Sequence, residues 1–191
     1  MKKLFLMAVM ALATVSSFAQ QAVGTFSIQP KVGLSLANVT KGDGDIRVGA
    51  VAGAEFEYQV SDIFSLSAGA LYSMQGCKGE VEGIDATVKL DYLNIPILAN
   101  VYVAKGLAVK LGIQPGFNVT SKASVEKSGT KVTTDLDGIE SVDFSIPIGL
   151  SYEINNFVID GRYNLGVSKI MDGSDSKNSV FQFTLGYKFA L

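Results

Sequence analysis

Large apolar residues alternate with small or polar residues along most of this chain. The segment FQFTLGYKF at 181–189 shows the pattern over nearly its whole length. Because successive side chains of a β-strand point to opposite faces, each such segment has one apolar and one polar face. The pattern predicts an all-β fold and leaves open which face points to the protein's centre.

Eight such segments are predicted, and the connections between them alternate strictly in length. The segments lie at about 26–38, 47–60, 63–76, 87–104, 107–120, 142–154, 157–170 and 179–190. Three connections have two residues, as in β-hairpins: SD at 61–62, KG at 105–106 and NN at 155–156. The other four are longer and rich in Gly, Asp, Ser and Lys. The chain therefore predicts an eight-stranded antiparallel up-and-down transmembrane β-barrel, with short periplasmic turns and longer extracellular loops.

Charged side chains are predicted to lie inside this barrel. Six basic and six acidic strand residues share the polar face, and Lys169, beside a long loop, is the one strand charge on the apolar face. An eight-stranded barrel is just wide enough for side chains to fill it, and buried charges need partners. This favours a polar plug over an ion or proton path. The predicted lumen charge network consists of Lys31, Glu55, Glu57, Lys110, Glu153, Asp160, Arg162 and Lys188.

The fourth segment fits this arrangement only with a change of phase near 92–93. Lys89 and Asp91 are odd-numbered, whereas Asn94 and Asn100 are even-numbered. A β-bulge at this point would place all four on the polar face.

Aromatic residues on the apolar face gather near both ends of the strands, as expected at the two interfaces of a membrane. Near the short turns these are Tyr58, Phe64, Tyr152, Phe157, Tyr187 and Phe189; near the long loops they are Tyr72, Phe117, Phe144 and Phe181. A Lys or Arg on a lipid-facing surface costs about 2–4 kcal/mol near the bilayer midplane. The near absence of charge from the apolar face therefore predicts that this face meets lipid.

The N-terminus predicts export. MKK is followed by the apolar run LFLMAVMALATV and by small residues at Ser17 and Ala19, which is typical of a signal peptide at 1–19 before a barrel domain at 20–191. Cleavage would leave 16 − 2 = 14 basic and 18 acidic residues, a balance that does not suggest a nucleic-acid partner. No later apolar run approaches the ~18 residues of a transmembrane helix.

The composition argues against an enzyme. The chain has no His, so it has neither a catalytic triad of the usual kind nor a common zinc site. Asp160 and Arg162 lie two residues apart on one strand face, which favours an ion pair over a catalytic carboxylate. The single Cys77 cannot form an intramolecular disulfide. We expect no catalytic, cofactor or metal site.

Three sequence pieces carry a resemblance to a known family: YLNIP at 92–96, GRYNLG at 161–166 and LGYKF at 185–189. With the order of the segments around them, they resemble the outer-membrane β-barrel domain family common in Bacteroidota, a porin-family or PorT-like group among small barrels of the OmpA and OmpX type. The resemblance implies insertion into the outer membrane of a Gram-negative bacterium by the barrel-assembly machinery. The resemblance indicates the cellular location of the protein more specifically than its function.

Three functions remain open. The leading hypothesis is a monomeric outer-membrane barrel, in contact with lipid and lipopolysaccharide, whose external loops bind an unknown partner; the loop at about 121–141 is the longest. A narrow porin is the alternative. A third possibility is a soluble exported β-barrel that binds a small apolar ligand, with the apolar face inside.

Overall fold

The computed structural model describes residues 21–40, 44–81, 84–127, 130–171, 173 and 175–191. The predicted signal peptide lies outside these residues. The strands are β1 (Phe26–Val39), β2 (Asp45–Ser61), β3 (Phe64–Val81), β4 (Ile84–Asn94), β5 (Ile97–Ala104), β6 (Leu107–Lys127), β7 (Thr130–Asp135), β8 (Val142–Ile154), β9 (Phe157–Gly166), β10 (Asn178–Tyr187) and β11 (Phe189–Ala190). Among the described residues there is no helix of the length and hydropathy needed to cross a membrane.

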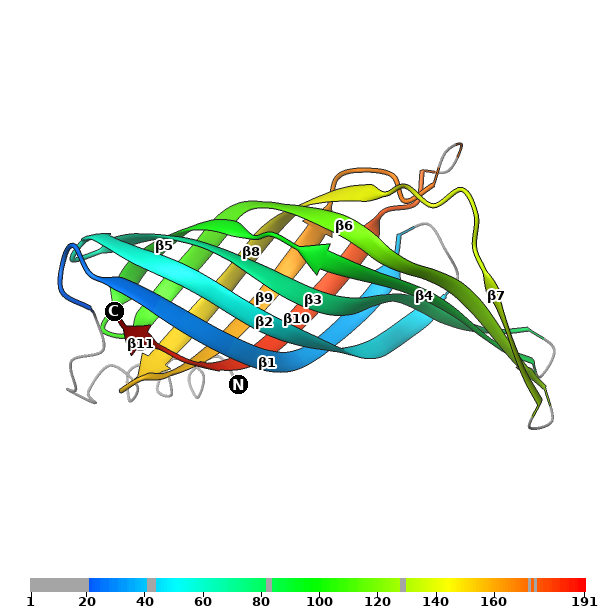
Figure 1. Ribbon diagram of the computed structural model, residues 1–191, viewed down its shortest axis with the longest axis horizontal. Coiled ribbons are helices and arrows are strands. Elements are labelled where there is room, and N and C mark those ends of the chain that lie inside the picture. Colours follow the sequence, from blue (N-terminus) through cyan, green and yellow to red (C-terminus); the bar gives the residue numbers. More distant parts are fainter. Residues whose placement is uncertain (1–20, 41–43, 82–83, 128–129, 172, 174) are drawn as a thin grey trace, which may run out of the picture.

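The strands form a closed antiparallel ring in the order β1, β2, β3, β4 with β5, β6, β8, β9 and β10 (Figure 1). The pairing of β1 with β10, from Lys31 opposite Gly186 to Val39 opposite Asn178, closes it. β11 continues β10 in the same register along β1, with Phe189 opposite Ile28. The eight-stranded up-and-down barrel predicted from the sequence is confirmed.

Pro96 divides the fourth wall strand into β4 and β5. Proline has no N–H to donate to a ladder. The register along β3 is nevertheless unbroken, because Leu71 faces Asn94 and Ala68 faces Ile97. β4 and β5 therefore act as one strand of the barrel wall.

The short turns lie at 62–63, 105–106 and 155–156. Two of them match the predicted positions, and the first is displaced by one residue from the predicted 61–62. Gly106 and Asn155 have positive φ angles of 74° and 56°, a backbone conformation that two-residue hairpins often require.

Beyond the opposite end of the barrel, β3, β4 and β6 continue and, together with β7, form a projecting sheet (Figure 1). We call it the blade; it consists of residues 76–81 of β3, 84–89 of β4, 121–127 of β6, and β7. β7 pairs with β6 and was not predicted, since this part of the chain was expected to be a loop. The blade joins the barrel without a break because β3, β4 and β6 run from the wall into it, and β7 is added along β6.

The apolar face of the wall points outward and the polar face inward. Val32, Leu34 and Leu150 are more than half exposed, whereas Glu55 and Asp160 are buried. A soluble barrel with an apolar interior required the reverse arrangement, so the third functional hypothesis is wrong for this structure.

The predicted phase change in the fourth strand is also wrong. β4 keeps one register along β3, with Leu93 opposite Tyr72 and Asp91 opposite Met74. Asp91 therefore shares the outward face of Tyr72, as does Lys89 two residues before it. The bulge lies in β6 instead, where Val119 is skipped between the partners of Asp91 and Tyr92.

Candidate functional site

The centre of the lumen is occupied by an arginine that joins opposite walls. Arg162 on β9 donates from Nη2 to Glu55 Oε1 on β2 at 2.8 Å, and from Nε to Asp160 Oδ1 at 2.9 Å. All three side chains are at most 2% exposed. The planar guanidinium suits this position because its several N–H groups can reach two carboxylates at once.

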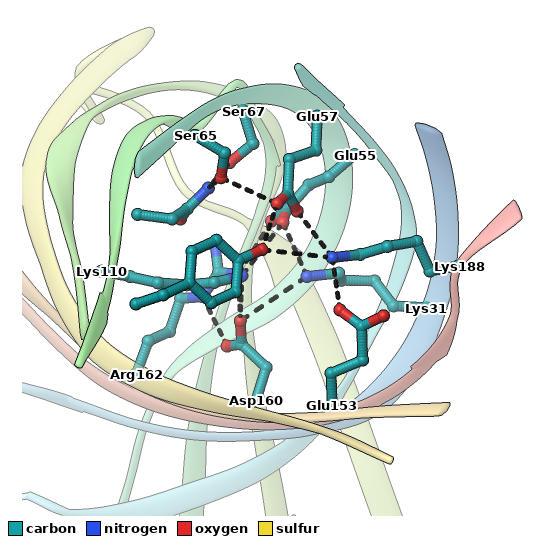
Figure 2. A network of polar contacts seen from close by, with 12 residues as sticks. Lys31, Glu55, Glu57, Ser65, Ser67, Lys110, Glu153, Asp160, Arg162 and Lys188 are labelled. Atoms are coloured by element: carbon teal, nitrogen blue, oxygen red, sulfur yellow. Dashed lines mark hydrogen bonds and ion pairs between the residues drawn. The ribbon is translucent and has the colours of Figure 1, made fainter. Parts of the chain in front are cut away.

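Two lysines complete this central cluster (Figure 2). Lys31 Nζ lies 2.7 Å from Glu55 Oε2, and Lys110 Nζ lies 2.8 Å from Asp160 Oδ2. The cluster thus holds three cations and two carboxylates contributed by β1, β2, β6 and β9. Its contacts tie together strands that are not neighbours in the wall.

A second cluster lies closer to the short turns. Lys188 Nζ lies 2.7 Å from Glu153 Oε2 and 3.2 Å from Glu57 Oε2. Glu57 Oε1 also accepts hydrogen bonds from Tyr102 Oη at 2.6 Å and from Ser65 Oγ at 2.7 Å. This cluster holds one cation and two carboxylates, so the two clusters together contain four charges of each sign.

All eight residues predicted for the lumen charge network take part in these ion pairs. The structure adds neutral members that the sequence reasoning missed, chiefly Tyr102 and Ser65. Tyr102 has the same even parity as Asn94 and Asn100 on the fourth strand, so the alternation itself could have placed its hydroxyl inside.

Glycines in the wall make room for the charged side chains. A Cβ added at Gly69 would lie 2.6 Å from Cγ of Glu55, and one added at Gly149 would lie 2.7 Å from Cβ of Arg162. Neither contact is compatible with ordinary packing. Small residues beside large buried ones let an eight-stranded barrel enclose long side chains.

The lumen is capped by apolar side chains at the blade end. Leu90, Tyr92 and Ile170 are buried there, with Val39, Val88 and Ile139 packed against them. An isolated β-bridge between Ile139 and Met171 joins the two long loops above this cluster. This apolar cap was not predicted.

Arg47 and Asp91 form a separate pair in the wall near the blade. Arg47 Nη1 lies 3.0 Å from Asp91 Oδ1, and Tyr72 Oη donates to Asp91 Oδ2 at 3.0 Å. Arg47 also donates to the carbonyl oxygen of Gln75, where the ladder between β2 and β3 is interrupted. The guanidinium thus reaches a carboxylate on the outward face.

The predicted aromatic residues all lie on the outward face, and each is at least partly exposed. Rings at the short-turn end contact one another, as in the pairs Phe157–Tyr187 at 5.1 Å and Tyr187–Phe189 at 4.6 Å between ring centroids. Phe26 stacks on Tyr58 at 4.5 Å, and it was missed as a member of this group. Among the residues that the structure describes, no three His, Cys, Asp or Glu side chains form a group that could hold a metal ion.

A closed antiparallel ring with charged side chains inside and apolar side chains outside is typical of β-barrels that span a membrane. The model of the outer membrane protein β-barrel domain family matches residues 18–172. This chain belongs to that family. It is an outer-membrane β-barrel protein of a Gram-negative bacterium, so the blade and long loops are extracellular and the short turns periplasmic.

Solved structures show the same barrel fold in other outer-membrane proteins. Ail of Yersinia pestis, in complex with the heparin analogue sucrose octasulfate, is 20% identical with a TM-score of 0.50, over 87% of this chain and 99% of that one. Neisserial surface protein A is 18% identical with a TM-score of 0.54, over 86% and 97%. No curated protein matches this chain significantly.

Proposed function

We propose that this outer-membrane barrel is a closed scaffold whose blade binds an extended peptide segment of an extracellular partner. The observation that carries the proposal is the edge of β7. This strand pairs with β6 on one side and, within the described part of the chain, with no strand on the other. An edge strand offers N–H and C=O groups that an added strand can pair with.

One face of the blade supplies apolar contacts beside this edge. Val125 on β6 faces Val132 on β7, and they are 43% and 60% exposed. The row next to them contains Cys77, Val88 and Ala123. The opposite face is polar and includes Lys122, Ser124, Glu126, Thr133 and Asp135. An extended peptide could therefore pair with the β7 backbone and place alternate side chains on the valines.

Substitution of Val132 tests this surface. In protein held in nanodiscs, we expect Val132→Lys to weaken binding of synthetic peptides that alternate Val with Lys or Glu by about tenfold or more, a loss of about 1.4 kcal/mol. Fluorescence anisotropy of labelled peptides measures the affinity. The matched control is Thr133→Lys, which places the same charge on the other face and should bind as the unsubstituted protein does. Equal losses in both variants, or no binding by the unsubstituted protein, would contradict the proposal.

The filled lumen favours a scaffold over a narrow porin. The eight residues of its two charged clusters pair with one another, and the apolar cap covers them at the extracellular end. For the same reason we assign no catalytic step to these groups. Assembly as a monomer is also part of the proposal, since ring closure leaves no open strand edge in the wall.

Conductance distinguishes the scaffold from the porin. We expect the purified protein, reconstituted in a planar bilayer in concentrated KCl, to give no steady single-channel current, because the ion pairs and the cap leave ions no hydrated route. A stable open level in most insertions would show that the lumen conducts.

Contacts with the outer membrane itself are a further part of the proposal. Lys78, Lys89 and Lys122 share the outward face of the blade just above the aromatic residues at that end. Lys89 and Lys122 are direct cross-strand partners, and like charges in that position repel. Asp135 offsets part of this repulsion, because its Oδ1 lies 3.7 Å from Lys122 Nζ, and phosphate groups of lipopolysaccharide would offset the rest. We also propose insertion by the barrel-assembly machinery and membership of the PorT-like group of Bacteroidota, on the sequence pieces that suggested them.

A further inference from the structure

A cavity of about 260 Å³ lies at the extracellular mouth of the barrel, and residues of the apolar cap form much of its lining. Its lining comes from β1, β3, β4 and the two long loops: Val39, Cys77, Val88, Leu90, Leu136, Ile139, Ile170, Met171 and Ser176. Cys77 and Val88 also belong to the apolar face of the blade beside β7, whereas no residue of the two charged clusters lines the cavity. The proposed peptide site uses the exposed valines and the β7 edge and does not use this space.

Backbone hydrogen bonds hold the roof of this cavity in place. Glu140 N donates to Ile170 O at 2.8 Å, and Ile170 N donates to Ser176 O at 3.0 Å. Leu136 N donates to Ser121 O at 2.9 Å, which ties the first loop to β6. Together with the bridge between Ile139 and Met171, these bonds join the two loops to each other and to β6.

The chemistry of the lining selects against water and charged molecules. Among the lining residues that the structure describes, Ser176 has the one hydroxyl group, and Cys77 and Met171 carry sulfur. A water molecule held in a protein cavity needs two to four hydrogen-bonding partners, and apolar cavities instead take up apolar molecules. A cavity of about 150 Å³ lined by Leu, Ile and Phe is large enough for benzene.

The residues at the inner and outer ends of the cavity determine from which side a molecule can enter it. Leu90 and Ile170 belong to the buried cap below, which closes the way to the polar lumen. Met171 is 37% exposed at the outer side and provides an approach from the extracellular medium. A molecule that enters is therefore held at the mouth and does not pass through the barrel.

We propose that this cavity is an extracellular binding site for a small uncharged apolar molecule, of about the size of one substituted aromatic ring. The fit of an apolar lining to an apolar molecule supplies the affinity. The lining residues that the structure describes carry no charged group, which favours an uncharged molecule over an ion.

Methyl NMR of the protein in nanodiscs, titrated with toluene, tests this site. Toluene also enters the lipid, so methyl groups on the lipid-facing wall serve as the internal control. We expect the methyl resonances of Ile139, Ile170 and Leu90 to shift along a saturable curve. Those of Leu150 and Ile159, which are exposed on the outward face, should shift in proportion to added toluene without saturation.

Filling the cavity should abolish the saturable response. In Val88→Phe the new ring occupies the space, and we expect the apparent affinity for toluene to fall by about tenfold or more. The matched control is Val101→Phe, the same change on the lipid-facing wall, which should keep the response. If Val88→Phe does not fold, Ile139→Phe fills the cavity from the loop side, away from the wall. Proportional shifts at all sites, an unchanged response in the filled variant, or contacts between the lining methyls and lipid chains would overturn the proposal.

Discussion

Replacing Asp160 with Asn should lower the free energy of unfolding by about 3–5 kcal/mol, the cost of leaving buried charge without its partner. The substitution keeps the shape of the side chain and removes its charge. Arg162, Lys110 and Lys31 would then face Glu55 as the only carboxylate of the central cluster. Because the chain contains no Trp, urea unfolding in lipid is best followed by far-ultraviolet circular dichroism.

The same substitution at the surface provides the control. Asp175 lies 2.9 Å from Lys169 and is 63% exposed, so Asp175→Asn should cost no more than about 1 kcal/mol. Adding Lys110→Met to the Asp160→Asn variant removes one of the stranded cations and should recover part of the loss. If the two Asn variants are equally stable, water reaches Asp160 and the lumen is not a closed network.

The second large effect is expected on the outward face. Ile148 lies on β8 midway between the aromatic residues Phe144 and Tyr152, and it is 48% exposed in the isolated chain. Ile148→Arg should destabilise the protein in a bilayer by about 2–4 kcal/mol, because the guanidinium would lie in hydrocarbon. The measurement is again urea unfolding in phospholipid vesicles.

Val132→Arg is the matched control for this prediction. Val132 is 60% exposed, somewhat more than Ile148, and it lies on the blade, outside the membrane. Its substitution should change the stability by no more than about 0.5 kcal/mol. Equal small effects at both positions would mean that Ile148 faces water.

The wall and its charges could be predicted from the sequence because one physical rule acts on every residue between the two interfaces. There, a charge outside costs several kcal/mol and a charge inside needs a partner. Lys31, Glu55 and Arg162 obey both parts of the rule. Their alternating positions along the strands were therefore enough to predict that their side chains point into the lumen.

The same rule failed where the strands leave the membrane. Lys89 and Asp91 were assigned to the interior because they are charged, although their parity along β3 places them outside. At that height neither charge lies unpaired in hydrocarbon: Lys89 is half-buried where the blade leaves the barrel, and the buried Asp91 pairs with Arg47 at 3.0 Å. Outside the membrane-spanning part of a strand, the charge of a residue no longer predicts which face it lies on. The phase change was predicted because the rule was applied to Lys89 and Asp91, which lie beyond that part.

The apolar cap and β7 had no local signal that could reveal them. Ile139 and Ile170 come from loops whose positions depend on contacts between distant parts of the chain, including the bridge from Ile139 to Met171. The β7 segment TKVTTD is polar and short, so its pattern resembles a loop. Only its register with β6 makes it a strand.

The direction of the apolar face can be measured by spin labelling along β8. Single cysteines at positions 144–152, introduced one at a time into a Cys77→Ser background in lipid vesicles, report collision rates with oxygen, which concentrates in lipid, and with a water-soluble relaxation reagent. We predict a period of two, with the highest oxygen accessibility at Ile146, Ile148 and Leu150 and low accessibility to both reagents at Ser145 and Ser151. High accessibility of Ile148 to the water-soluble reagent, or the absence of any period, would contradict a barrel whose apolar face meets lipid.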